Sequence, residues 1–148
     1  MEANRYAGQE LRAFAAAVLE RLGVGEDDAF RTADSLIRAD LEGHASHGIS
    51  RLLIYARRLA QGRINPNPHL TYERKGAVLL VDGDNGIGQA VAFRALQAAY
   101  PVADELGVAA VFIRASNHFG TAAYFCQEAA GRGYASIVTT NSPPGIAP

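Results

Sequence analysis

Ser46, His47, Arg51 and Tyr55 are the residues whose types and spacing are best suited to chemistry. The imidazole of His47 can exchange a proton near neutral pH, and the guanidinium of Arg51 can hold a carboxylate by two parallel hydrogen bonds. Apolar residues recur at helical spacing between Ser46 and Ala60, so the segment is predicted to be one amphipathic helix capped by Ser46. Positions 47, 51 and 55 would share its polar face. This pattern favours a site for a small carboxylate, although a merely solvated helix face has the same spacing.

A second candidate is the loop Asn117-His118-Phe119-Gly120. It follows a predicted strand over 108–113 and precedes a predicted helix over 121–132. Ligands of α/β proteins bind at the carboxyl ends of strands, which favours a functional role for His118. A loop histidine followed by a glycine that relieves a tight turn is the alternative.

Two other patterns fit their apparent functions poorly. The glycines of Gly83–Gly88 occur in the order G-x-x-G-x-G, whereas the Rossmann dinucleotide fingerprint is G-x-G-x-x-G. Asp40, His44 and His47 have spacings that allow metal ligation, but nothing completes a ligand set, so no metal site is predicted. A metal-dependent hydrolase built on these three residues remains an alternative that would require bound metal.

Composition limits the classes of protein. The 148 residues are 49% hydrophobic and 20% charged with a net charge of -1, which is typical of a globular protein and argues against nucleic acid as a partner. Cys126 is the only cysteine, so no intramolecular disulfide can form and a reducing, cytoplasmic setting is expected. The N-terminal residues lack an apolar signal core, and no apolar run is long enough to span a membrane.

The predicted elements fall into two units of an α/β chain. Residues 1–75 form a helical unit, with helices over 11–22, 26–41 and 46–60. Residues 76–148 contain a strand over 77–81, a helix over 89–106, the strand and helix around His118, and a last strand over 134–139. Pro101 is expected to bend or divide the helix over 89–106 near Tyr100.

Six motifs together indicate a family. In order, they are Ala39-Asp40-Leu41-Glu42-Gly43, Ser46-His47-Gly48 with Arg51 and Tyr55, Gly62 with Ile64-Asn65-Pro66, Asp82 to Gln89, Asn117-His118-Phe119-Gly120, and Thr140-Asn141-Ser142. Taken together they resemble the malate/L-lactate dehydrogenase family, which is distinct from the Rossmann lactate and malate dehydrogenases. The resemblance covers nearly the whole chain from Ala39 onward.

The resemblance implies an NAD- or NADP-dependent oxidoreductase that acts on a small 2-hydroxy or 2-oxo acid. It implies a mixed-sheet, non-Rossmann cofactor domain, of which residues 76–148 would be the first part, and a homodimer in the full-length form. His47 would be the proton donor or acceptor with Ser46 as its relay partner, and Arg51 would bind the substrate carboxylate beside Tyr55. The expected cofactor-binding residues are His118, Phe119, Gly120, Thr121, Ala122 and Ser142, with His118 also a catalytic candidate.

Family members are more than twice as long as this sequence. The acidic partner expected for His47 and the rest of the cofactor site would lie beyond Pro148, so the chain alone is expected to bind cofactor poorly and to turn over slowly or not at all. The alternative is an inactive fragment that serves only as a folding or dimerisation module. The sequence identifies neither the particular acid nor the choice between NAD and NADP.

Overall fold

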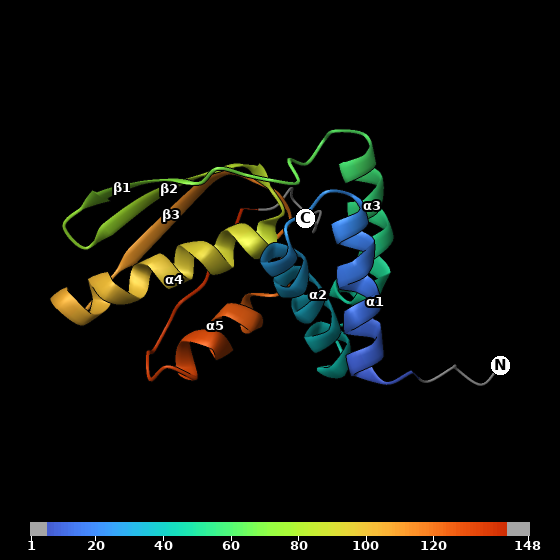
Figure 1. Ribbon diagram of the computed structural model, residues 1–148. Coiled ribbons are helices and arrows are strands. Elements are labelled where there is room, and N and C mark those ends of the chain that lie inside the picture. Colours follow the sequence, from blue (N-terminus) through green and yellow to red (C-terminus); the bar gives the residue numbers. More distant parts are fainter. Residues whose placement is uncertain (1–5, 142–148) are drawn as a thin grey trace, which may run out of the picture.

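The computed structural model of the protein describes residues 6–141 of the chain. Three helices from the first part of the chain gather at one end, and a three-stranded sheet lies at the other (Figure 1). Two further helices lie on one side of the sheet, with α4 between the strands and α5. The architecture is therefore mixed α/β, as predicted.

Helices α1 (Gly8–Arg21) and α2 (Glu26–Leu41) form the first pair, and α2 has the bounds that the sequence predicts. Small residues on their facing sides let the two helices approach closely around a shared core. Its buried members include Ala15, Leu19, Ala29, Ala33, Leu36, Tyr55, Leu59 and Ile64. Phe30 and Leu41 share an apolar face of α2 with Ala33 by helical spacing, but they are 45% and 73% exposed, because the core is centred on Ala33 and Leu36.

The single helix expected over 46–60 is wrong. The segment begins with two 3-10 turns, η1 (Ala45–His47) and η2 (Ile49–Arg51), and only then continues as α3 (Leu52–Ala60). Gly48 separates the two turns in an extended conformation, with φ −85° and ψ −155°. That conformation interrupts the helical geometry that the apolar periodicity predicts.

The sheet has the order β1-β2-β3. β1 (Thr71–Lys75) pairs antiparallel with β2 (Val78–Gly86), and β2 pairs parallel with β3 (Ala110–Ser116). The sequence does not predict β1, because all five of its residues are exposed and no alternation marks the strand. The hairpin of β1 and β2 spans the division expected at residue 75.

Helix α4 (Gly88–Leu106) connects β2 to β3 and covers one face of the sheet. Their shared core contains Leu79, Val81, Ala95, Ala99 and Val102. Pro101 lies inside α4 but does not divide it. Across residues 6–141, no helix combines the length and the apolar character that crossing a membrane requires.

The last helix, α5 (Ala122–Ala130), is followed by an irregular segment. The strand expected over 134–139 does not form there, and Ile137 is 94% exposed. A strand needs a hydrogen-bonding neighbour, and this segment pairs with none of the strands that the structure describes. The β-branched residues of this segment are therefore not enough by themselves to form a strand.

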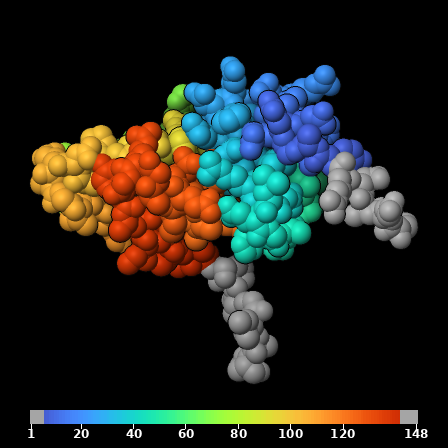
Figure 2. All heavy atoms as spheres, turned by 90° about the horizontal axis from the view of Figure 1, so that it is seen from below, coloured from blue at the N-terminus to red at the C-terminus, as the bar shows by residue number. Residues whose placement is uncertain are grey.

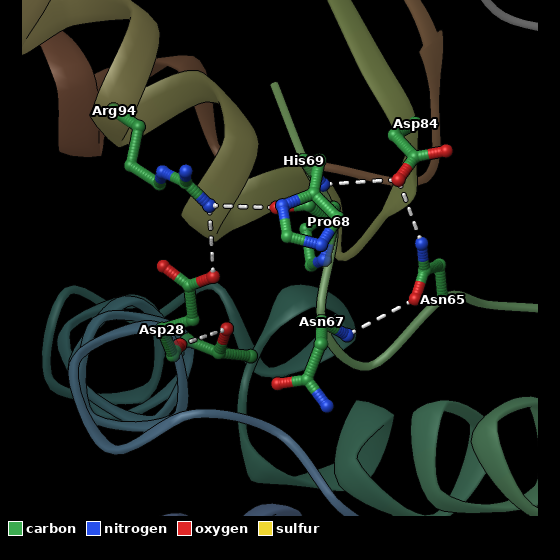
Figure 3. Close-up of polar contacts among 8 residues, drawn as sticks. Asp28, Asn65, Asn67, Pro68, His69, Asp84 and Arg94 are labelled. Carbon is green, nitrogen blue, oxygen red and sulfur yellow. Dashed lines mark hydrogen bonds and ion pairs between the residues drawn. The ribbon is translucent and has the colours of Figure 1, made fainter.

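Asp84 fixes the linker that runs from α3 to β1. Its carboxylate accepts hydrogen bonds from the side chain of Asn65 and the backbone N–H of His69, both at 2.9 Å (Figure 3). Asp84 has a positive φ of 46° where the register of β2 shifts, which turns its side chain out of the strand pattern. Asp84 therefore serves a structural role in a motif that superficially resembles a dinucleotide fingerprint.

Arg94 makes a second tie between the helical end and the sheet end. Its Nη1 lies 3.4 Å from Oδ2 of Asp28 on α2 and 3.3 Å from the carbonyl oxygen of Pro68 in the linker (Figure 3). Burial raises the pKa of Asp28, an effect opposed by the positive charge of Arg94. The two ends of the described chain are therefore joined by polar contacts as well as by packing.

Candidate functional site

Residues from two distant parts of the sequence meet at His118. The rings of His47 and His118 stack with their centroids 5.3 Å apart, and the hydroxyl of Tyr55 lies 2.8 Å from His118 Nδ1. On the underside of the molecule, the surface around residues 40–50 meets that of α5 (Figure 2, teal beside orange-red). There Gln127 donates a hydrogen bond of 2.9 Å to Glu42. The structure thus brings together the two candidate motifs of the sequence.

Tyr55 is placed differently from its prediction. The amphipathic pattern puts it on the polar face, but its ring is 2% exposed and belongs to the core of the helical end. Only its hydroxyl reaches the site, where it also accepts a 2.8 Å hydrogen bond from Nε2 of Gln89. Burial raises the pKa of Tyr55, so the phenol keeps its proton at neutral pH and can donate it in a hydrogen bond.

Ser46 does not cap a helix. Its Oγ lies 2.9 Å from Nδ1 of His47, and no side-chain cap is formed at the start of η1 or α3. Nε of Arg51 donates a 2.6 Å hydrogen bond to the backbone carbonyl of Ser46, which holds the guanidinium beside His47. Within residues 6–141, nothing else bonds Nη1 or Nη2 of Arg51. These two terminal groups are therefore available to a carboxylate.

Asp40 supplies the capping contact that was expected of Ser46. Its Oδ2 accepts a 2.7 Å hydrogen bond from the backbone N–H of Ile49, at the start of η2. A Cβ atom at position 48 would overlap this carboxylate, so Gly48 is required for the close approach of Asp40. Asp40, His44 and His47 do not gather into a group able to hold a metal ion, and residues 6–141 contain no such group of three or more.

The loop after β3 approaches the first turn of α4 very closely. A Cβ atom at position 88 would overlap the carbonyl oxygens of Asn117 and His118, so glycine is needed there. Asn117 also donates hydrogen bonds of 3.0 Å and 2.9 Å to the carbonyls of Asn85 and Gly86. These contacts hold His118 at the carboxyl end of β3, the position that the sequence indicates.

The site is electropositive. The pKa of His118 is lowered, chiefly by burial and then by the charges of Arg51, His47 and Arg58. None of the described carboxylates makes a hydrogen bond or ion pair with His47 or His118. A neutral His118 beside two arginines suits an anionic ligand.

The remaining expected cofactor residues line the start of α5. Phe119 stacks on Phe125 with ring centroids 5.2 Å apart, Gly120 is buried, and Thr121 and Ala122 are half-buried at the first turn. Ser142 lies outside the described residues.

Gln89 is the site residue that sequence reasoning missed. It is fully buried, although glutamine is usually a surface residue. The sequence marked Gln89 only as the last residue of the Asp82–Gln89 motif and indicated no role for this residue. Arg58 lies close to the same helical line as Arg51 by spacing, but the sequence indicates no function for it.

Comparison with known proteins supplies the family. The family model described as malate/L-lactate dehydrogenase matches residues 6–148. Malate dehydrogenase of Pyrococcus abyssi is 43% identical over 140 residues, which cover 94% of this chain and 39% of that relative. The (2R)-3-sulfolactate dehydrogenase (NADP(+)) of Chromohalobacter salexigens is 36% identical over 95% of this chain and 42% of its own length.

Among solved structures, malate dehydrogenase from Pyrococcus horikoshii OT3 superposes with a TM-score of 0.85 and 40% sequence identity, covering 88% of this chain and 38% of that one. The chain thus spans about two fifths of the length of the curated relatives it matches. The family model nevertheless covers nearly all of the chain, and the fold and the sequence agree. The chain belongs to the malate/L-lactate dehydrogenase family.

Proposed function

We propose that this chain supplies the carboxylate-binding and proton-transfer part of an oxidoreductase. The reaction moves hydride between NAD or NADP and C2 of a small 2-hydroxy or 2-oxo acid. The observation that carries the proposal is the convergence of His47, His118 and the unengaged end of Arg51 at one strand end. The names of the relatives, malate and sulfolactate dehydrogenases, support the same substrate class.

Each of these residues has a distinct task. Arg51 holds the substrate carboxylate with its terminal Nη groups, because Nε is already bonded to Ser46. His47 donates a proton to the C2 oxygen during reduction and accepts it during oxidation, while Ser46 fixes its ring through Nδ1. His118, neutral and bonded to Tyr55, offers its other ring nitrogen to the substrate or the nicotinamide.

The residues at the start of α5 fit a dinucleotide. Thr121 makes no side-chain cap, so the first-turn N–H groups of α5 can donate to phosphate oxygens. Residues 118–122 would hold the cofactor beside His47, and Ser142 remains a proposed contact. When bound, the nicotinamide ring supplies or accepts the hydride. A homodimer is likewise proposed.

Cofactor binding separates the proposal from an inactive folding module. NADH and NADPH fluorescence should be titrated with the 148-residue chain, with and without oxamate, a carboxylate analogue that cannot be reduced. We expect weak, saturable binding that oxamate strengthens, because both ligands would occupy adjoining parts of one site. A fluorescence change that neither saturates nor responds to oxamate would favour the alternative, an inactive fragment that serves only as a folding or dimerisation module.

A further inference from the structure

A buried chain of three side chains ends at His118. Gln89, the second residue of α4, donates from Nε2 to the Tyr55 hydroxyl at 2.8 Å, and this hydroxyl lies 2.8 Å from His118 Nδ1. Gln89 is 0% exposed and Tyr55 is 2% exposed. Hydrogen bonds in such a low-dielectric setting are strengthened, and each one influences the next.

The chain has a direction. A carboxamide NH2 group can only donate, so Tyr55 accepts from Gln89 and its own proton is left for His118. The backbone N–H of Gly120 also donates to His118 Nδ1, at 3.4 Å. Two donors directed at Nδ1 require that nitrogen to be unprotonated. The neutral ring therefore carries its proton on Nε2.

We propose that Gln89 is a positioning residue that fixes, through Tyr55, the ring nitrogen of His118 that carries the proton. The value of this arrangement for catalysis rests on the proposed function, whereas the hydrogen-bond chain does not. With the proton on Nε2, His118 presents a donor on the side of the ring away from Tyr55. A substrate or carboxamide oxygen would meet a hydrogen bond there, not a lone pair.

The Gln89 amide takes the required orientation because the Gly120 N–H also donates to His118 Nδ1, which leaves the Tyr55 hydroxyl as a second donor that accepts from Nε2 of Gln89. Its Oε1 and the hydroxyl of Ser35 are both buried without a hydrogen-bond partner among residues 6–141. Both side chains border Gly120. Nε2 is the amide atom that borders Gly120, and it is also the atom that donates to the Tyr55 hydroxyl.

The charges that face His118 are consistent with a neutral ring. His47 from η1, Arg51 from η2 and Arg58 from α3 all disfavour the imidazolium. A carboxylate at position 89 would act in the opposite direction and favour the imidazolium. It would accept a hydrogen bond from the Tyr55 hydroxyl, whose oxygen could then accept from His118 Nδ1–H.

The test is the tautomer of His118, read from ¹⁵N chemical shifts of its ring nitrogens in the 148-residue chain. In the wild type we expect the proton on Nε2. Gln89→Glu should move it to Nδ1 and raise the pKa of His118, and Gln89→Met, of similar shape but unable to donate, should give a mixture of both tautomers. Gln97→Glu, further along α4, should change neither quantity.

A double-mutant comparison separates a relay through Tyr55 from a general structural effect. In a Tyr55→Phe background, Gln89→Glu should no longer change the tautomer. The proposal is overturned if the wild-type ring carries its proton on Nδ1, if neither Gln89 variant alters the tautomer, or if Gln89→Glu acts equally with Phe at 55. These readings need no cofactor or substrate, so failure of the proposed dehydrogenase function would leave them interpretable.

Discussion

At the scale of single residues, burial and charge act together on His118. Its ring is half-buried against His47 and Tyr55, and nearby arginines add to the effect of desolvation. The site therefore pairs a histidine held neutral, His118, with His47, whose second nitrogen is free of Ser46. Two histidines in different environments can take different roles in one proton transfer.

The lowered pKa of His118 predicts a pH dependence of stability. Between that pKa and the ordinary value of 6.5, the unfolded chain binds more protons than the folded one, so stability rises with pH in this window and levels off above it. Urea unfolding at pH 7.5, 6.5 and 5.5 should show the loss on acidification. His118→Gln should reduce the unfolding free energy that is lost between pH 7.5 and pH 5.5. His69→Gln, in an exposed loop, should leave that loss unchanged. If the His118→Gln variant lost as much unfolding free energy as the wild type, His118 would not be the cause of the pH dependence.

At the scale of elements, local patterns predict some features and tertiary contacts decide the others. The bounds of α2 follow from its apolar spacing and its acidic first turn. The break before α3 does not, because it depends on Asp40 reaching Gly48 across eight positions. Helical spacing predicts that His47 and Arg51 share a site, although the structure places them in two separate 3-10 turns. The role of Gln89 follows from burial that only the folded chain creates.

The close approach of α4 to the His118 loop yields a second prediction. Alanine is a better helix former than glycine, so propensity alone predicts that Gly88→Ala stabilises the chain by up to about 1 kcal/mol. The overlap with two carbonyl oxygens predicts the opposite, a loss of roughly 1–3 kcal/mol, with displaced His118 ring signals.

Urea denaturation and the NMR spectrum of His118 measure both effects of Gly88→Ala. Gly131→Ala, where the added Cβ meets nothing closer than 3.4 Å, is the matched control and should be nearly neutral. A stabilised Gly88→Ala variant with an unmoved His118 would show that the loop does not depend on this glycine.

At the scale of the whole molecule, a buried carboxylate joins three helices. Asp34 on α2 lies 2.8 Å from Nε of Arg12 on α1 and 3.3 Å from Nε of Arg38, and it accepts a 3.1 Å hydrogen bond from Tyr124 on α5. Burial beside Asp34 raises the pKa of Tyr124, so the phenol stays protonated and continues to donate. The network connects α5, which begins at the last of the proposed cofactor residues 118–122, to the helical end.

Removing this carboxylate should destabilise the whole chain. Asp34→Ala is expected to cost about 2 kcal/mol, less than the roughly 3–5 kcal/mol for breaking a fully buried ion pair, because the arginine side chains are 27% and 37% exposed. Glu73→Ala, which removes an exposed pair with Lys75, should change stability by less than about 0.5 kcal/mol. Equal unfolding free energies for the two variants would show that Asp34 does not hold the helices together.

Arg51 is proposed to bind a substrate carboxylate beside His47 and His118. The direct measurement follows the ring signals of all four histidines by NMR while the chain is titrated with pyruvate or oxaloacetate. We predict saturable shifts at His47 and His118, binding weakened at least about tenfold by Arg51→Lys, and no change with Arg57→Lys on the exposed side of α3. Acetone, which lacks a carboxylate, should shift nothing. Unchanged affinity in Arg51→Lys, or shifts only at the exposed His44 and His69, would show that Arg51 does not bind the carboxylate at this site.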